Sequence, residues 1–283
     1  MSTHDRALGC FIGLAVGDAL GAPVEFKEVG EFVPVTDYRF GGAFKLPEGY
    51  WTDDTSLALC LADSILEKNK IDEFDLLDRF VRWYKLGENS STGRCFDIGN
   101  TTRRALEHFL ATAKYRPADD DFDAAGNGSI MRLAPVAIRW FSDNAAIEEN
   151  ALRQGLTTHG AYTCTAACKE LGNLLGSAIR GEYIMPKLKL FADNVVNVPN
   201  SGYVVDTMIA AKWAVGSTTN FEDAILAAVN LGGDADTIGA VAGQLAGAIY
   251  GLSGIKQDWV NRLHRHEHLI NIANKLYEAG TMP

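Results

Sequence analysis

Apolar residues recur every three to four positions along most of the chain, which is the spacing of one face of an α-helix. Strand signals are weak and confined to residues 31–40, and strands do not alternate with helices. We therefore expect an all-α fold, a compact single-domain bundle of about ten helices over residues 1–283. The pattern predicts helices over residues 5–21, 55–69, 73–86, 100–114, 129–140, 145–156, 161–181, 203–215, 220–230 and 256–279, and one more around residues 239–251.

Two of these predicted helices carry glycine at every fourth position. The sets are Gly9, Gly13, Gly17 and Gly21 near one end of the chain, and Gly239, Gly243, Gly247 and Gly251 near the other. This spacing places each set on one helix face. A glycine inside a helix costs about 1 kcal/mol relative to alanine, so a close approach by another helix or a ligand is expected. Packing of the two faces together would bring the loop after the first helix near the loop before the late one.

Composition and charge narrow the range of functions. The formal net charge is −10, which argues against a general nucleic-acid binder, because such proteins need a basic surface. Phosphate on a small ligand stays compatible with this charge, since helix N-termini and metals also bind phosphate. No apolar run of about 18–20 residues is evident, so we expect no membrane span. Five scattered cysteines and the lack of a signal peptide predict free thiols and a cytoplasmic location.

Three clusters of oxygen-bearing side chains stand out. They are Glu25 at the end of Gly17–Glu25, the run Thr52-Asp53-Asp54-Thr55, and the run Asp234-Ala235-Asp236-Thr237. The last two each open a predicted helix, where Asp and Thr commonly act as N-caps. Taken singly, each run is explained by capping.

The combination favours a different interpretation. If the clusters converge, five carboxylates share one site, and such a concentration of like charge needs protons or cations. No cluster of Lys or Arg lies nearby in the sequence to compensate. Hard divalent cations such as Mg²⁺ prefer these ligands, so the clusters are a candidate site for two metal ions.

At these positions the chain resembles the ADP-ribosylglycohydrolases, which include dinitrogenase reductase-activating glycohydrolase and the ADP-ribosylarginine hydrolases. The resemblance covers residues 5–255 and implies an all-α fold with two Mg²⁺ or Mn²⁺ ions. It implies metal ligands at Thr52, Asp53, Asp54, Asp234, Asp236 and Thr237, with Glu25 beside them. Six motifs in order carry it: Gly17–Glu25, Trp51–Thr55, Cys95–Thr102, Gly126–Pro135, Thr157–His159 and Gly232–Gly239.

Further motifs are candidates for substrate binding. Asn127, Gly128 and Ser129 precede a predicted helix, where backbone amides bind a diphosphate well, although a turn and N-cap would look the same. Ser91 and Gly93 belong to a second such loop. The resemblance implies that glycine-rich segments line the ADP-ribose cleft.

Three more residues gain a role chiefly from the resemblance. It places Asp97 beside the ribose or arginine, His159 near the diphosphate, and Tyr203 against the ligand. Each has an ordinary alternative: Asp97 as a helix N-cap, His159 as a structural histidine and Tyr203 as part of the core.

Together these features predict hydrolysis of the glycosidic bond of ADP-ribosyl-arginine in a modified protein, releasing ADP-ribose. Glu25 is the candidate general base, and Asp97 is expected to pair with the guanidinium of the substrate. The target is left open, with a toxin or a regulatory protein as candidates. The alternatives are an O-linked substrate (ADP-ribosyl-serine or O-acetyl-ADP-ribose), a non-catalytic structural member, and a protein that also occludes its target through surface segments 114–126 and 184–201.

Overall fold

The computed structural model describes residues 1–115 and 125–282, and in these ranges the protein is helical. The first half contains α1 (Thr3–Gly21), the 3-10 turn η1 (Ala22–Val24), α2 (Asp53–Lys68), α3 (Glu73–Leu86) and α4 (Asn100–Thr112). The second half contains α5 (Ala134–Arg139), α6 (Asn144–Gly155), α7 (Tyr162–Arg180), α8 (Met185–Ala192), α9 (Val204–Gly216), α10 (Phe221–Val229), α11 (Ala235–Tyr250), η2 (Leu252–Gly254), α12 (Gln257–Arg262) and α13 (His266–Thr281).

The centre of the fold is the contact between α1 and α11, which run antiparallel with their backbones touching. A Cβ atom built on Gly13 would lie 2.2 Å from the carbonyl oxygen of Gly243, and one on Gly17 would lie 2.0 Å from that of Gly239. Only glycine allows this approach, because it has no Cβ. The predicted packing of the two glycine faces is confirmed, and it brings the end of α1 beside the start of α11.

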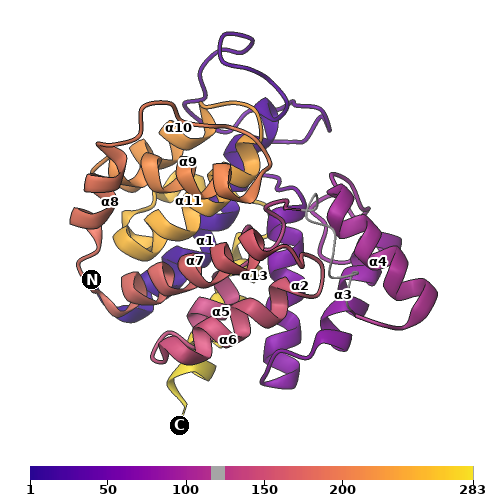
Figure 1. Cartoon of the computed structure of the whole chain (residues 1–283). Coiled ribbons are helices and arrows are strands. Elements are labelled where there is room, and N and C mark those ends of the chain that lie inside the picture. The colour runs from indigo at the N-terminus through magenta and orange to yellow at the C-terminus, as the bar shows by residue number, and fades with distance from the viewer. Residues whose placement is uncertain (116–124, 283) are drawn as a thin grey trace.

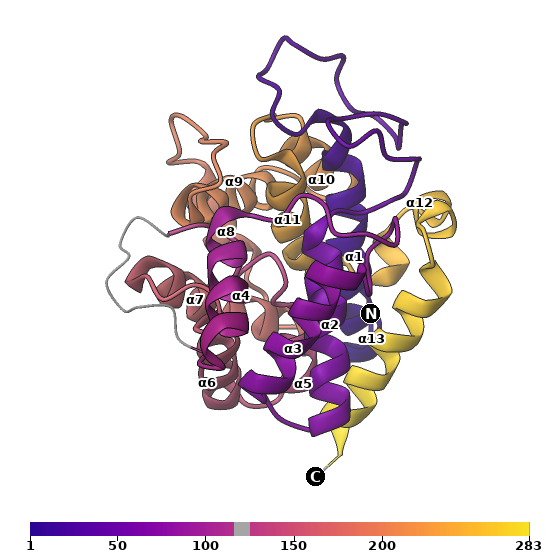
Figure 2. The same cartoon turned by 90° about the vertical axis from the view of Figure 1, so that its right-hand side faces the viewer.

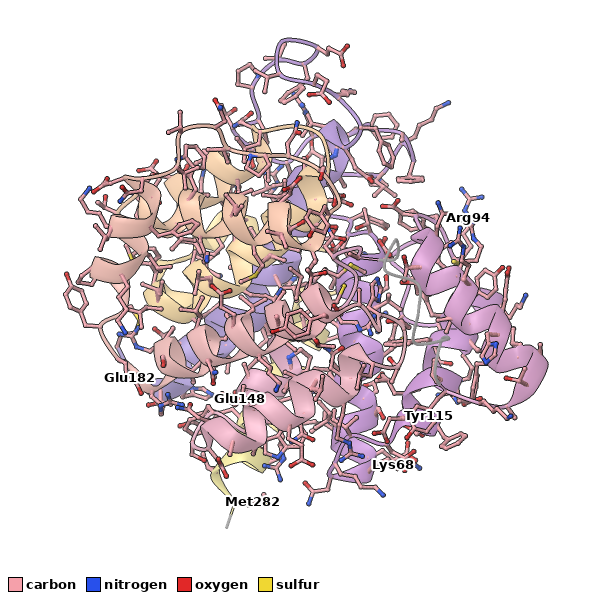
Figure 3. All side chains as sticks on the ribbon, viewed as in Figure 1. Lys68, Arg94, Tyr115, Glu148, Glu182 and Met282 are labelled. Carbon is pink, nitrogen blue, oxygen red and sulfur yellow. The ribbon has the colours of Figure 1, made fainter. Side chains whose placement is uncertain are left out.

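The other helices surround this central pair (Figures 1 and 2). On one side α13 packs against α1, α2 and α5, and on the other α9 and α10 pack against α11. The loop between η1 and α2 projects at one end of the molecule in both views. Figure 3 shows Lys68, the last residue of α2, far from Arg94, which lies in the loop before α4. Helix α2 therefore ends away from Arg94, and its N-terminus lies on the side of the molecule where Arg94 is found.

Two predicted helices are shorter or interrupted in the structure. The helix predicted over 129–140 begins only at Ala134, because Pro135 in its first turn favours a helix start there and residues 129–133 form turns. The helix predicted over 256–279 is divided into α12 and α13. Arg265 has a left-handed backbone (φ 53°), and the amide of His264 donates to the carbonyl of Gly49 (2.9 Å) instead of continuing a helix.

The surface and loop segments also differ from the expectations. Residues 31–40 form no strand. Instead the side chain of Asn230 bonds both backbone groups of Val35, accepting from its N–H (2.7 Å) and donating to its C=O (2.9 Å). Segment 184–201 contains a helix, α8, and most of segment 114–126 lies outside the described residues.

Helix α1 starts earlier than the predicted residue 5, and with η1 it forms an apolar stretch that the sequence analysis did not expect. Residues Thr3–Val24 meet the length and hydropathy criteria for a membrane span, but the whole apolar window is buried inside the fold. Its apolar character is therefore explained by its place at the centre of the core. The five cysteines are free thiols, as predicted.

Candidate active site

The N-termini of α2 and α11 meet at the end of the central helix pair. Thr52 and Asp234 occupy their N-cap positions, yet neither side chain makes the usual hydrogen bond to the backbone of its helix. The hydroxyl of Thr52 instead lies 3.1 Å from Asp54 Oδ2 and 3.1 Å from Asp236 Oδ2. The two helix starts therefore direct their polar side chains toward one another.

Asp18, a residue that the sequence analysis did not single out, provides the missing cap. It projects from α1, is fully buried, and accepts hydrogen bonds from the amides of Thr52 (2.8 Å) and Thr55 (3.0 Å). It also accepts from the hydroxyls of the same two residues, at 2.9 and 2.6 Å. The signal was present in Gly17-Asp18-Ala19, a carboxylate on an otherwise apolar helix.

The predicted convergence of the carboxylates is seen in the structure. Ligand oxygens of Asp18, Asp54 and Asp236 lie within 4.8 Å of one another, and so do those of Glu25, Asp234 and Asp236. Thr237 Oγ1 lies 3.4 Å from Asp54 Oδ2, and Asp53 is 7% exposed at the same helix start. All the predicted metal ligands therefore lie in one cluster with Glu25.

Backbone hydrogen bonds hold Glu25 beside Asp234. The amide of Phe26 donates to the carbonyl of Gly233 (2.7 Å), and the amide of Gly233 donates to that of Lys27 (2.8 Å). Gly233 has a φ of 62°, and a Cβ there would lie 2.2 Å from the carbonyl oxygen of Asn200. Phe26 has a φ of 63° although it is not glycine, a conformation that is uncommon for bulky residues.

Burial raises the pKa of every carboxyl in the cluster, and repulsion by neighbouring carboxylates adds to the shift for Glu25, Asp53, Asp54, Asp97 and Asp236. For Glu25, burial first and then the charges of Asp97, Asp234 and Asp54 raise the pKa to about 11. Burial raises the pKa of Asp97 to about 7 and that of Asp18 to about 6, despite four hydrogen bonds to Asp18. Asp53, Asp54, Asp234 and Asp236 shift in the same direction, again with burial as the largest cause.

The donor set fits divalent cations. Three buried carboxylate oxygens, Glu25 Oε2, Asp54 Oδ1 and Asp97 Oδ2, have no hydrogen-bond partner. Buried acceptors are normally satisfied, and carboxylates with threonine hydroxyls are ligands that Mg²⁺ and Mn²⁺ prefer. A buried acidic cluster that could bind metal is therefore present in the protein.

The cluster forms the floor of a cleft of about 390 Å³. Its lining includes the predicted residues Glu25, Asp53, Asp97, Asn127, Gly128, His159, Asp234, Asp236 and Thr237. None of the described residues that line the cleft is Lys or Arg. The cleft therefore combines a negative floor with small and polar walls from the segments around residues 97–102 and 126–128.

Asp97 and Asn127 have defined places in this cleft. Asp97 does not cap α4, whose N-cap is Gly99; it has a φ of 56° and lies beside Glu25 and Asp236. The amide nitrogen of Asn127 donates to Asp234 Oδ2 (2.5 Å) and to Thr207 Oγ1 (2.9 Å). Asn127 thus ties the predicted diphosphate loop to the acidic cluster, but this loop is a series of turns and not the start of a helix.

Four other predicted binding residues lie away from the lining. Ser91 is buried and donates to the carbonyl of Trp51 (2.6 Å), which supports the loop before α2. Gly93 is exposed with a φ of 74°, Ser129 is fully buried beneath the cleft, and Tyr203 is 42% exposed at the start of α9. None of these four residues is among those that line the cleft.

Comparisons with known proteins identify the family to which this helical fold and its buried carboxylate cluster belong. The family model described as ADP-ribosylglycohydrolase matches residues 1–283, and the chain belongs to this family, which is hydrolytic.

Named relatives resemble the chain over most of its length. It is 41% identical to "ADP-ribosylarginine hydrolase Tri1" of Serratia proteamaculans, covering 96% of this chain and 79% of the relative. It is 37% identical to "ADP-ribosyl-[dinitrogen reductase] glycohydrolase" of Rhodospirillum rubrum, covering 93% and 91%. A solved structure titled "ADP-ribosylglycohydrolase-related protein complex" matches with a TM-score of 0.87 at 40% identity, covering 99% of both chains.

Proposed function

We propose that residues 1–283 act as one domain that hydrolyses the N-glycosidic bond of ADP-ribosyl-arginine in a modified cytoplasmic protein. The observation that carries this proposal is the set of buried carboxylates whose oxygens lack partners, at the floor of a cleft. The arginine preference is supported by the relatives named as ADP-ribosylarginine hydrolases. It also agrees with an acidic cleft, which attracts a guanidinium cation.

Two divalent cations, Mg²⁺ or Mn²⁺, would be held by Thr52, Asp53, Asp54, Asp234, Asp236 and Thr237. When bound, such cations polarise oxygen ligands and lower the pKa of water. Their positive charge would also lower the pKa of Glu25, since nearby opposite charge favours the ionised carboxylate. With such cations bound, Glu25 would be ionised and could act as a base, although burial and neighbouring charges raise its pKa in the bare cluster.

The reaction adds one water across the bond between the anomeric carbon and the guanidine nitrogen. The water oxygen would bond to the anomeric carbon as the carbon–nitrogen bond breaks. Glu25 would accept the proton that this water loses, and that proton would pass to the leaving guanidine. Asp97, beside Glu25, would pair with the guanidinium and hold the arginine against the ribose. The opposite wall of the cleft, with Gly128 and His159, would hold the diphosphate.

The proposal is tested with peptides that carry ADP-ribose on arginine or on serine, incubated with Mg²⁺, Mn²⁺ or EDTA and analysed by mass spectrometry. We expect release of ADP-ribose from the arginine peptide with metal and none with EDTA. Equal rates in EDTA and in metal would overturn the metal dependence. Faster release from the serine peptide or from O-acetyl-ADP-ribose would favour the O-linked alternative, and no release from any substrate would favour a non-catalytic role.

A further inference from the structure

Arg132 is a fully buried cation without a carboxylate partner among the described residues. Its Nε donates to Gln154 Oε1 (2.9 Å), and its Nη2 donates to the carbonyl oxygen of Gln154 (3.1 Å) and to Thr158 Oγ1 (2.9 Å). Its remaining nitrogen, Nη1, has no hydrogen-bond partner. The guanidinium also packs on the ring of Phe80, 4.7 Å from the centroid. A buried unpaired cation is costly, so a function for this arrangement is expected.

The contact with Thr158 determines how the neighbouring histidine is protonated. Arginine can only donate, so Thr158 Oγ1 accepts from it. The same hydroxyl lies 2.7 Å from Nδ1 of His159. If Nδ1 carried the proton, the hydroxyl hydrogen of Thr158 would have no acceptor in the described part of the chain, at a site where burial makes this costly. The satisfied arrangement has Thr158 donating to Nδ1, which leaves the proton of the neutral ring on Nε2.

The Nε2 side of His159 faces the cleft. The ring packs against the glycine loop, because a Cβ on Gly128 would lie 2.7 Å from Cε1 and 3.0 Å from Nε2 of His159. His159 itself lines the cleft. Burial and the charge of Arg132 lower the pKa of His159 to about 3, so the ring is neutral at physiological pH and presents one N–H donor.

We propose that Arg132 and Thr158 are positioning residues that hold His159 as the neutral Nε2–H tautomer, so that the cleft offers a fixed donor to a ligand oxyanion. Under the proposed function, on which this assignment rests, that oxyanion is the diphosphate of ADP-ribose. The other ionisable groups that line the cleft are carboxylates, which repel phosphate unless cations are bound. His159, packed against Gly128, would then offer the phosphate an N–H donor in one fixed orientation, a contact that a freely rotating ring would not provide.

The test combines a tautomer measurement with ligand binding. Nitrogen-15 NMR of histidine-labelled protein should show a protonated Nε2 and an unprotonated Nδ1 for His159, assigned with His159→Gln. Thr158→Val removes the hydroxyl with little change of shape and should abolish this preference. It should weaken ADP-ribose binding about tenfold by calorimetry in Mg²⁺ and raise KM with little change in kcat, as expected when a binding contact is lost equally from substrate and transition state. Thr158→Ser, which keeps the hydroxyl, should retain both properties.

The outcomes separate this proposal from the proposed function. An Nδ1–H tautomer in the unaltered protein, which needs no variant to be stable, would overturn the assignment. So would unchanged ADP-ribose affinity in a folded Thr158→Val protein. Absence of ADP-ribose binding by the unaltered protein would count against the proposed function. The NMR signal would still show how His159 is protonated, and its response to inorganic pyrophosphate would show whether His159 contacts an oxyanion.

Discussion

Two kinds of helix N-terminus occur in this protein, although the residue types at their caps are similar. At α6, Asp143 accepts hydrogen bonds from the amides of Ala145 (2.9 Å) and Ala146 (3.1 Å), and at α10, Asn220 accepts from the amide of Asp223 (2.9 Å). At α2 and α11 the cap residues Thr52 and Asp234 make no such bond. The first kind completes its own helix, and the second kind leaves its side chains available for another role.

The difference arises from what each helix start faces. The caps of α6 and α10 are exposed. Those of α2 and α11 meet at the end of the central helix pair, because the glycine contact sets the start of α11 beside the end of α1, and Asp18 of α1 accepts from the amides of Thr52 and Thr55. The hydroxyl of Thr52 has one hydrogen, yet it lies within 3.1 Å of oxygens from Asp18, Asp54 and Asp236. Asp18 also accepts from two amides and the hydroxyl of Thr55, but a single hydroxyl hydrogen cannot serve both Asp54 and Asp236, so this pair requires protons or cations.

The largest expected effect comes from removing one charge at the second kind of helix start. Asp236→Asn keeps the shape of the side chain but weakens a proposed metal ligand. We expect turnover of an ADP-ribosyl-arginine peptide to fall at least about a hundredfold, which corresponds to about 2.7 kcal/mol of transition-state free energy. Stability without metal should stay equal or rise, because one buried like charge is removed.

A matched control for this prediction is Asp223→Asn, the same chemical change in the first turn of the capped helix α10, at an exposed position. It should leave turnover unchanged. Circular dichroism and metal titration of both variants separate loss of fold from loss of metal. Near-normal turnover of folded Asp236→Asn protein at limiting metal would show that α11 begins with an ordinary cap, as the capping alternative holds.

The sequence contains enough information for the framework of this site but not for its details. The four-residue spacing of glycines predicted the α1–α11 contact, and with it the approach of the loop after the first helix to the loop before the late one, because spacing on a helix is a local property. The family resemblance then supplied a role for Glu25, which isolated motifs would have left open.

Other features depend on contacts between distant segments, which local patterns do not encode. Asp18 caps a helix whose N-cap residue, Thr52, lies 34 residues later along the chain, so its role is defined only by the folded structure. The break at Arg265 depends on Gly49, whose carbonyl accepts from the amide of His264. Ser129 was expected at a helix start, but Pro135 moves that start onward and leaves Ser129 in the core.

The second prediction concerns the pH dependence of stability without metal. The folded-state pKa values of Asp18, about 6, and Asp97, about 7, lie above the ordinary aspartate pKa of 3.8. The folded protein therefore binds more protons than the unfolded chain between about pH 4 and 7, so these carboxyls stabilise it at the acidic end and this contribution is lost as pH rises. Each unit of pKa difference corresponds to about 1.4 kcal/mol.

Thermal unfolding in EDTA should therefore show a melting temperature that falls from pH 5 to pH 8. Saturating Mg²⁺ binds the ionised carboxylates, so it should reduce or reverse this fall, because metal affinity rises as ligands lose protons. Groups elsewhere in the protein titrate equally in both series and cancel in the difference. Parallel curves with and without Mg²⁺ would mean that the buried carboxylates do not bind the ion.

The smallest expected effect lies at the first kind of helix start, at Asp143. Asp143→Ala removes both cap hydrogen bonds of α6, which should cost about 1 kcal/mol of unfolding free energy and lower the melting temperature by a few degrees. Turnover should not change, since Asp143 is exposed and is not among the residues that line the cleft. Asp143→Asn should be silent in both measurements, because asparagine caps about as well as aspartate. The same Asp-to-Asn change would then have no effect at α6 and would inactivate the protein at α11. A loss of turnover in Asp143→Asn would contradict the distinction between the two kinds of helix start.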